Sequence, residues 1–198
     1  KGMNVELSGD RLVGKHVGGP DALGGGLIGD APLMESSGVF YFEVRVDEVR
    51  RGMADGMAIG VTTMAPATVM EVPETMDSLS SCWLVGYDGQ MVNSEVGHWK
   101  PVSWNSRDLS RGDLVGALVT SSGQLFIFVN GKHCVDGPTG IPISQPLYPV
   151  VDLVGNTAAV KMQLSGSLPA HHKPRTTGSM ARDSKVMQGF CRELHGAS

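Results

Sequence analysis

The chain has 198 residues, of which 41% are hydrophobic and 18% are charged, and its formal net charge is −4. This balance is typical of a globular protein that buries a core, and it argues against a disordered chain. The acidic balance gives no sign of a nucleic-acid partner, whose binding face would be basic. No apolar run approaches the roughly 20 residues that span a bilayer, so the sequence predicts no transmembrane helix.

The cysteines and the start of the chain bear on the compartment. Cys82, Cys134 and Cys191 are odd in number and far apart, and they form no C-x-x-C pair. The chain has no N-x-S/T glycosylation site, and it begins at Lys1 without a signal-peptide pattern, as an excised fragment would. We therefore expect a reduced, intracellular and most simply cytoplasmic protein.

The first clear strand is "VFYFEVRVDE", residues 39–48, in which apolar and polar residues alternate with a period of two. Its inward-facing residues are predicted to be Phe40, Phe42, Val44 and Val46, and the residues facing away are Tyr41, Glu43, Arg45 and Asp47. The next apolar run, residues 57–63, follows a Gly-containing connection and is expected to pair back with this strand.

Two further segments are predicted to be β-hairpins. Residues 82–93 have Asp88-Gly89 at their centre, a pair that supplies the positive φ angles of a tight turn. Residues 147–164 have Gly155-Asn156 at their tip. On the returning arm of the second hairpin, the residues expected to point inward are Ala158, Val160, Met162 and Leu164. Trp83, within the first hairpin, is expected to be a core residue.

Residues 112–134 form a third predicted hairpin, and its strands are apolar on both faces. One face can enter a core, so the other must be covered by loops or offered to a partner. With short runs near the start, the chain is expected to have roughly ten to twelve strands, and its 27 glycines and 11 prolines supply the turns. The predicted fold is an all-β, two-sheet antiparallel sandwich over residues 1–164.

Six separated segments occur in the order and spacing of one known family. They resemble a neuralized homology repeat, and they read "KGMNVELS", "YFEVRVDEV", "IGVTTMAP", "GDLVGALV", "LFIFVNG" and "LYPVVDLVGNTAAVKM". The resemblance implies a SPRY-like β-sandwich that works as a protein-interaction module. Several family members recruit targets to ubiquitin ligases, and some have been linked to phosphoinositides. The chain departs from the common pattern at residues 64–81 and in "VGHWKPVSW", residues 96–104.

The sequence gives no sign of a catalytic, cofactor or metal site, and we expect the protein not to be an enzyme. His171 and His172 are adjacent, but no carboxylate or cysteine stands at ligand spacing, which favours a solvated linker. The glycine-rich residues 18–30 lack the lysine of a P-loop, so a flexible surface loop is the simpler interpretation. Asp152 lies in an apolar strand and is interpreted as a hydrogen-bonded structural carboxylate.

The candidate partner-binding residues lie in two irregular segments. Residues 95–108 contain Trp99 and Trp104 as candidate anchors, with Asn105 and Arg107 to supply directional hydrogen bonds. Packing of both tryptophans onto the sandwich is the alternative. Residues 64–76 are rich in methionine and contribute Met70, because flexible thioethers suit adaptable surfaces, although they fill irregular cores equally well.

After Leu164 the composition changes. Residues 165–183 are predicted to be a linker, and residues 184–198 a tail with a short helix over 184–195, whose apolar stripe includes Val186, Phe190 and Leu194. The tail after Leu164 has five Lys/Arg against two acidic residues, a net charge of +3, which leaves −7 for residues 1–164. Opposite charge favours folding of the tail back onto the domain or onto a second copy as a homo-oligomer.

The sequence therefore predicts a module that recognises a peptide segment of another protein, as the recognition part of a ubiquitin ligase or scaffold. Two alternatives stay open. One is a lipid-headgroup module that binds phosphoinositides and recruits a scaffold to membranes, which an acidic domain disfavours. The other is a lectin-like sugar binder on a similar sandwich.

Overall fold

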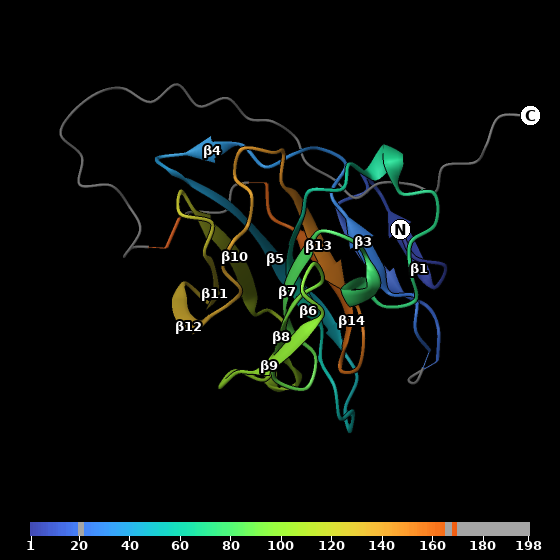
Figure 1. Cartoon of the computed structure of the whole chain (residues 1–198). Coiled ribbons are helices and arrows are strands. Elements are labelled where there is room, and N and C mark those ends of the chain that lie inside the picture. Colours follow the sequence, from blue (N-terminus) through green and yellow to red (C-terminus); the bar gives the residue numbers. More distant parts are fainter. Residues whose placement is uncertain (20–21, 165–167, 170–198) are drawn as a thin grey trace, which may run out of the picture.

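The computed structural model describes residues 1–19, 22–164 and 168–169, which form two antiparallel β-sheets packed face to face (Figure 1). Sheet A has the order β1 (Val5–Ser8), β2 (Val13–His16), β14 (Thr157–Met162), β5 (Val39–Val49), β10 (Leu114–Thr120), β11 (Leu125–Val129), β12 (Lys132–Asp136), with β4 (Glu35–Ser36) beside β5. Sheet B has the order β3 (Gly26–Ile28), β13 (Tyr148–Asp152), β6 (Ala58–Thr62), β7 (Cys82–Gly86), β8 (Gln90–Asn93), β9 (His98–Pro101). The predicted two-sheet sandwich is confirmed.

Three short 3₁₀ helices complete the described part: η1 (Pro66–Thr68), η2 (Met76–Ser78) and η3 (Ser106–Asp108). Among the described residues, no helix is long and apolar enough to cross a membrane. The 14 described strands exceed the ten to twelve expected, because strands such as β4 are too short to show an alternating pattern. The histidine pair, the linker residues 170–183 and the predicted tail helix lie outside the described residues.

The main core lies between the two sheets, and the alternation of β5 builds one side of it. Phe42, Val44 and Val46 are buried there, and Phe40 packs half-buried against the same cluster. Trp83 of β7 closes the core from sheet B and is fully buried. The period-two prediction for residues 39–48 and the core prediction for Trp83 are confirmed.

The strands β10 and β11 are apolar on both faces, and the structure buries both. Val115, Ala117 and Val119 enter the main core. On the outer face of sheet A, Leu118 and Phe128 form a second cluster with Val39, and Tyr41, Phe126 and Leu168 pack against it. Leu168, which follows β14 in the chain, thus covers part of the outer face of sheet A.

Deleting residues 165–198 is expected to lower the melting temperature of the domain. The deletion removes Leu168 from the outer cluster, and because this side chain is partly buried its loss is expected to cost about 1 kcal/mol. In a chain of this size, that corresponds to a shift of roughly 2–4 °C, measurable by circular dichroism. Truncation after Ala170, which keeps Leu168, is the matched control. Equal melting temperatures for the full chain and the chain ending at Leu164 would contradict the prediction.

Two predicted strand pairings are wrong. Residues 57–63 do not pair with 39–48, because β6 lies between β13 and β7 in sheet B while β5 lies between β14 and β10 in sheet A. The two arms of 147–164 also separate, β13 into sheet B and β14 into sheet A. Both connections cross from one sheet to the other at the same end of the sandwich, where the Asn156 N–H donates to the Asp55 carbonyl oxygen at 2.8 Å.

The surface-loop prediction for the glycine-rich segment is wrong for its second half, residues 24–29. Residues 24–29 are buried, and β3 pairs with β13 inside this stretch. A Cβ on Gly25 would lie 2.1 Å from the Leu153 carbonyl oxygen, and one on Gly26 would lie 2.3 Å from the Met76 sulfur. These glycines are there because only a bare backbone fits so closely against its neighbours.

Candidate functional site

The hairpin of β8 and β9 forms one edge of sheet B, and it carries the most exposed aromatic side chain of the described residues. The predicted turn between β7 and β8 is confirmed, since the Gly89 N–H donates to the Gly86 carbonyl oxygen at 3.1 Å. The positive φ angles lie at Tyr87 (54°) and Gly89 (91°), and not at Asp88 as predicted. In the β8–β9 register, Trp99 lies opposite Val92 and Lys100 opposite Met91. Successive side chains of a strand face opposite sides, so Trp99 lies on the outer face of sheet B and Lys100 faces the space between the sheets.

Trp99 rests on a fixed aromatic base. Its side chain is 46% exposed, and its ring lies 5.5 Å from the Tyr87 ring at a tilt of 47°. The Tyr87 hydroxyl is buried and donates a hydrogen bond to Asp152 Oδ2 at 3.0 Å. Burial, together with the nearby Asp152 charge, raises the pKa of Tyr87 well above its usual value, so this donor stays protonated. Trp99 is therefore presented to solvent from a rigid support.

Asp152 connects this support to the loop that covers sheet B. Its Oδ2 also accepts a hydrogen bond from the Met76 N–H at 2.8 Å, which confirms the interpretation of Asp152 as a hydrogen-bonded carboxylate. Burial raises the pKa of Asp152 to about 6, although the two hydrogen bonds act in the opposite direction. Its Oδ1 is buried and has no hydrogen-bond partner among the residues that the structure describes. Protonation of Asp152 as the pH falls through about 6 thus changes the acceptor of two hydrogen bonds, one from the loop at Met76 and one from Tyr87 beneath Trp99.

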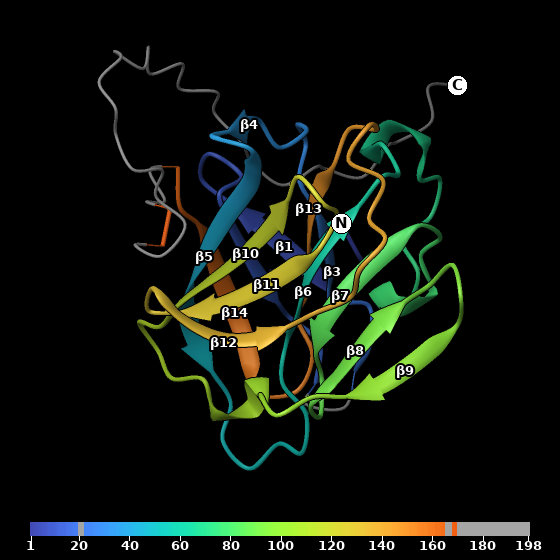
Figure 2. The ribbon, with the colours of Figure 1, turned by 60° about the vertical axis from the view of Figure 1, so that its left-hand side comes forward.

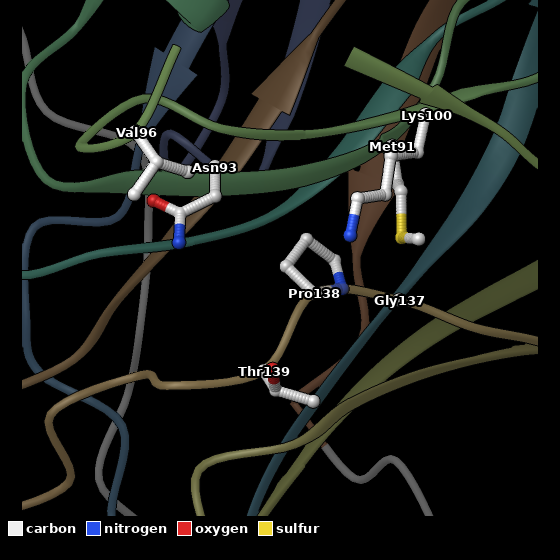
Figure 3. Close-up of a pocket in the computed structure, with 7 residues that line it drawn as sticks. All are labelled: Met91, Asn93, Val96, Lys100, Gly137, Pro138 and Thr139. Atoms are coloured by element: carbon white, nitrogen blue, oxygen red, sulfur yellow. The ribbon is translucent and has the colours of Figure 1, made fainter. Parts of the chain in front are cut away.

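A cavity of about 290 Å³ opens on the other side of β9, between the edges of the two sheets (Figure 3). Figure 3 shows Asn93 and Val96 near one end and Met91 and Lys100 near the other, facing Pro138 and Thr139. The chain after β12 reaches this position because Gly137 lies close to β7, where an added Cβ would meet the Val85 side chain at 2.7 Å. The cavity combines apolar walls with one amide and one ammonium group.

The main chain of β9 is also available along its outer edge. Among the described strands β9 pairs with β8 alone, and the Val102 N–H donates to the Gly89 carbonyl oxygen at 2.8 Å. Main-chain groups alternate in direction along a strand, so those of Trp99 and Pro101 point away from β8. Proline has no N–H, so the open edge offers the N–H and carbonyl of Trp99 and the carbonyl of Pro101.

We call these features the β8–β9 surface: the exposed Trp99, the cavity beside Lys100 and the open edge of β9, the strand at the edge of its sheet in Figure 2. Among the described residues, no group of three or more His, Cys, Asp or Glu side chains is placed to hold a metal ion. The arrangement places an exposed aromatic side chain beside a cavity and an unpaired strand edge.

Comparison with known proteins identifies the family. The family model described as Neuralized matches residues 1–164. The chain belongs to the Neuralized family. This match confirms the predicted resemblance, and the solved structures confirm the predicted SPRY-like sandwich. Neuralized and SPRY domains are protein-interaction modules.

Solved structures agree with this assignment at the level of the fold. The crystal structure of the Drosophila melanogaster neuralized-nhr1 domain matches with a TM-score of 0.62 and 16% identity, covering 82% of this chain and 92% of that chain. A human SPRY domain matches with a TM-score of 0.56 and 20% identity, covering 83% and 98%. The SPRY domain of human HERC1 matches with a TM-score of 0.53 and 16% identity, covering 82% and 95%.

The Neuralized domain does not bring the five predicted partner-binding residues together. Trp104 is half-buried against the main core. Asn105 caps η3, where its Oδ1 accepts from the Arg107 N–H at 3.0 Å. The Arg107 side chain is exposed and lines a different cavity. Met70 is 97% exposed on the loop over sheet B, whereas Met76 of the same loop is fully buried.

Sequence reasoning missed the rest of the β8–β9 surface in this Neuralized domain. Val96 and Lys100 belong to the segment singled out for its tryptophans, but neither carried a signal of its own. Pro138 and Thr139 come from a distant part of the chain, and only the strand order of the two sheets places them beside β9.

Proposed function

We propose that this Neuralized domain binds a short, extended peptide segment of a partner protein at the β8–β9 surface. The observation that carries the proposal is Trp99, exposed on the rigid base of Tyr87 and beside a cavity. Tryptophan is enriched among residues that dominate binding energy, since it buries a large area with few rotatable bonds. An indole held in place before binding also loses little conformational freedom on binding.

The geometry favours addition of the peptide alongside β9. An extended peptide there can hydrogen-bond to the N–H and carbonyl of Trp99. Its successive side chains then alternate between the outer face, where Trp99 lies, and the cavity beside Lys100. Pro101 limits the number of main-chain bonds, so side-chain contacts supply most of the affinity and specificity. Such a role is one of recognition rather than catalysis.

A place in ubiquitin ligation is part of this proposal. Recruitment of targets to ubiquitin ligases is what the family resemblance implies, so in a longer protein this domain would be the recognition part of a ligase or scaffold. The described residues offer binding groups at the β8–β9 surface, and the ligase activity would come from another chain or domain.

The test begins with a pull-down from the native cell, using residues 1–198 as bait. The captured partner is divided into overlapping peptides of about 15 residues, and each is titrated against the ¹⁵N-labelled domain. The proposal expects one peptide to bind and to shift the amide signals of residues 91–101 and 137–139. Shifts confined to other residues, or a partner that binds only as a folded domain, would overturn it.

Two parallel measurements test the alternative functions. Phosphatidylcholine vesicles that contain a phosphoinositide test lipid-headgroup binding, and a glycan array with and without calcium tests the lectin-like alternative. Binding to either one with shifts at residues 91–101, in the absence of any peptide binding, would replace the peptide assignment.

A further inference from the structure

A second cavity, of about 430 Å³, lies at the end of the sandwich where the connections cross between sheets. The connection from β5 to β6 descends to this end, at the bottom of Figure 2. The cavity is lined mainly by this connection and by the segment around η3, including Arg50, Arg51, Met53, Arg107, Arg111 and Asn156. Neither the β8–β9 surface nor the proposed mode of binding uses it.

The loops that line this cavity are held by a buried side chain. Asn156 is 5% exposed, and its Nδ2 donates to the carbonyl oxygens of Arg107 and Leu109, the latter at 3.3 Å. Its main-chain N–H donates to the carbonyl oxygen of Asp55, and its own carbonyl accepts from the Arg50 N–H. One residue thus ties together three loops, which fixes the main chain on both sides of the cavity.

The main chain beside the cavity is closely packed at Gly56 and Ser106. A Cβ on Gly56 would meet the Arg107 main-chain nitrogen at 2.4 Å, and Ser106 is fully buried with its hydroxyl donating to the Tyr87 carbonyl oxygen at 3.1 Å. The main chain from which the arginine side chains project is therefore held in place on both sides of the cavity. When an oppositely charged group binds, only the arginine side chains have to be ordered, and not the loops.

The charges at the cavity are unusual for this domain. Residues 1–164 carry a net charge of −7, yet the cavity is lined by four arginines against one acidic residue, Asp108. Within the described part of the chain, the Arg51 and Arg111 side chains make no hydrogen bond or ion pair. Arg107 Nε lies 3.9 Å from Asp108 Oδ1, and both side chains are largely exposed, so this ion pair is weak.

Arg50 plays a different part. Its Nη2 donates to the carbonyl oxygens of His16 at 2.9 Å and Gly18 at 3.3 Å, so its guanidinium group is engaged on the far side of the connection. Among the described residues, the arginines of the cavity without a strong ion pair or hydrogen bond are Arg51, Arg107 and Arg111. Met53 and Leu109 add apolar surface between them.

We propose that this cavity binds an acidic segment, rich in Asp and Glu, of the partner protein. The inference rests on the proposed function, because it assigns the chemistry of the partner. Guanidinium groups pair with carboxylates through two parallel hydrogen bonds, which gives direction as well as attraction. Residues 102–105 join β9 to η3, so one partner can engage both surfaces. An acidic segment is repelled by the rest of this acidic domain, which restricts it to the arginine cavity.

The test uses the full chain, labelled with ¹⁵N, and a 12-residue peptide of alternating Glu and Gly in 50 mM salt. The same peptide with Gln in place of Glu is the neutral probe. The proposal expects amide shifts at residues 50–53 and 107–111 with the Glu peptide and none there with the Gln peptide. Raising the salt concentration to 300 mM should weaken binding markedly, because exposed charges are screened.

The decisive variant is the triple change Arg51→Gln, Arg107→Gln and Arg111→Gln. It should weaken binding of the Glu peptide by about tenfold or more. The matched control is Arg45→Gln, Lys132→Gln and Lys161→Gln, which removes the same charge from strands of sheet A and should stay within about twofold of the parent. The single change Arg51→Gln, with an expected loss of about threefold, tests the site again should the triple variant unfold.

Several outcomes would overturn the inference. Equal losses in the two triple variants would mean that overall charge, not the cavity, governs binding. Equal binding of the Gln peptide would remove the role of carboxylates. Arginine-dependent binding to phosphatidylcholine vesicles containing phosphatidylserine, without peptide binding, would assign the cavity to a membrane. Persistence of Trp99-dependent partner binding in any of these cases would show that the proposed function stands while this inference fails.

Discussion

Replacing Trp99 by alanine is expected to weaken binding of the partner peptide by about thirty-fold, which corresponds to about 2 kcal/mol. The indole is 46% exposed and lies against the buried Tyr87, so its loss removes a binding anchor and uncovers only part of the apolar cluster on sheet B. The melting temperature of the variant should therefore fall by no more than about 2–4 °C. Isothermal titration calorimetry and a circular dichroism melt measure the two effects on the same sample.

Trp104→Ala is the matched control, since it removes the same side chain five residues away. Trp104 packs half-buried against the main core, so this change should destabilise the domain by roughly 2–4 kcal/mol and lower its melting temperature by several degrees. Peptide affinity per folded molecule should be nearly unchanged. If Trp99→Ala instead melts early and binds normally when folded, Trp99 is a packing residue and the binding surface lies elsewhere.

The second large effect is a pH dependence of stability that originates at Asp152. Burial raises the pKa of this carboxyl to about 6 in the folded domain, from an ordinary value of 3.8. Because the folded value is the higher one, the stabilisation is fully present below about pH 4 and is lost as pH rises through about 6. The full effect is about 3 kcal/mol, of which about 2 kcal/mol is lost between pH 4.5 and 7.5.

Asp152→Asn isolates this effect from other titrating groups. The amide keeps an acceptor for the Met76 N–H and the Tyr87 hydroxyl but carries no charge at any pH. Urea unfolding at pH 4.5 and 7.5 should show the parent losing about 2 kcal/mol relative to this variant. Tyr87→Phe, which removes a hydrogen bond that lowers the pKa of Asp152, should move the transition to higher pH. A parent–variant difference that is the same at both pH values would contradict the assignment.

Much of the fold could be predicted from local patterns. The alternation of β5 indicated which residues face the core, and the Asp88-Gly89 pair indicated the turn between β7 and β8. These features depend on neighbours in the chain, so a single sequence contains them. The apolar outer face of β10 and β11 was also visible, although what covers it depends on where the chain runs after β14.

What could not be predicted is which sheet each strand joins. The Gly155-Asn156 turn has the residues of a hairpin, yet it carries the chain from sheet B to sheet A. Turn residues satisfy local backbone geometry, and the destination of the next strand is decided by the packing of the whole sandwich. The same reason applies to the candidate site, because residues 137–139 meet β9 only through tertiary structure. Arg107 was selected beside the tryptophans, but it lines the cavity at the crossing connections.

The position of β14 has a consequence for how the protein is made. β14 is the last strand of the described chain, yet it lies between β2 and β5 inside sheet A. During synthesis, β1 and β2 therefore have no partner in the main sheet until Met162 has emerged from the ribosome. The sandwich cannot close strand by strand during synthesis, and one edge of β5 stays unpaired until β14 has been made. Until β14 arrives, that open edge can pair with a strand of another chain, so slow delivery of β14 favours aggregation.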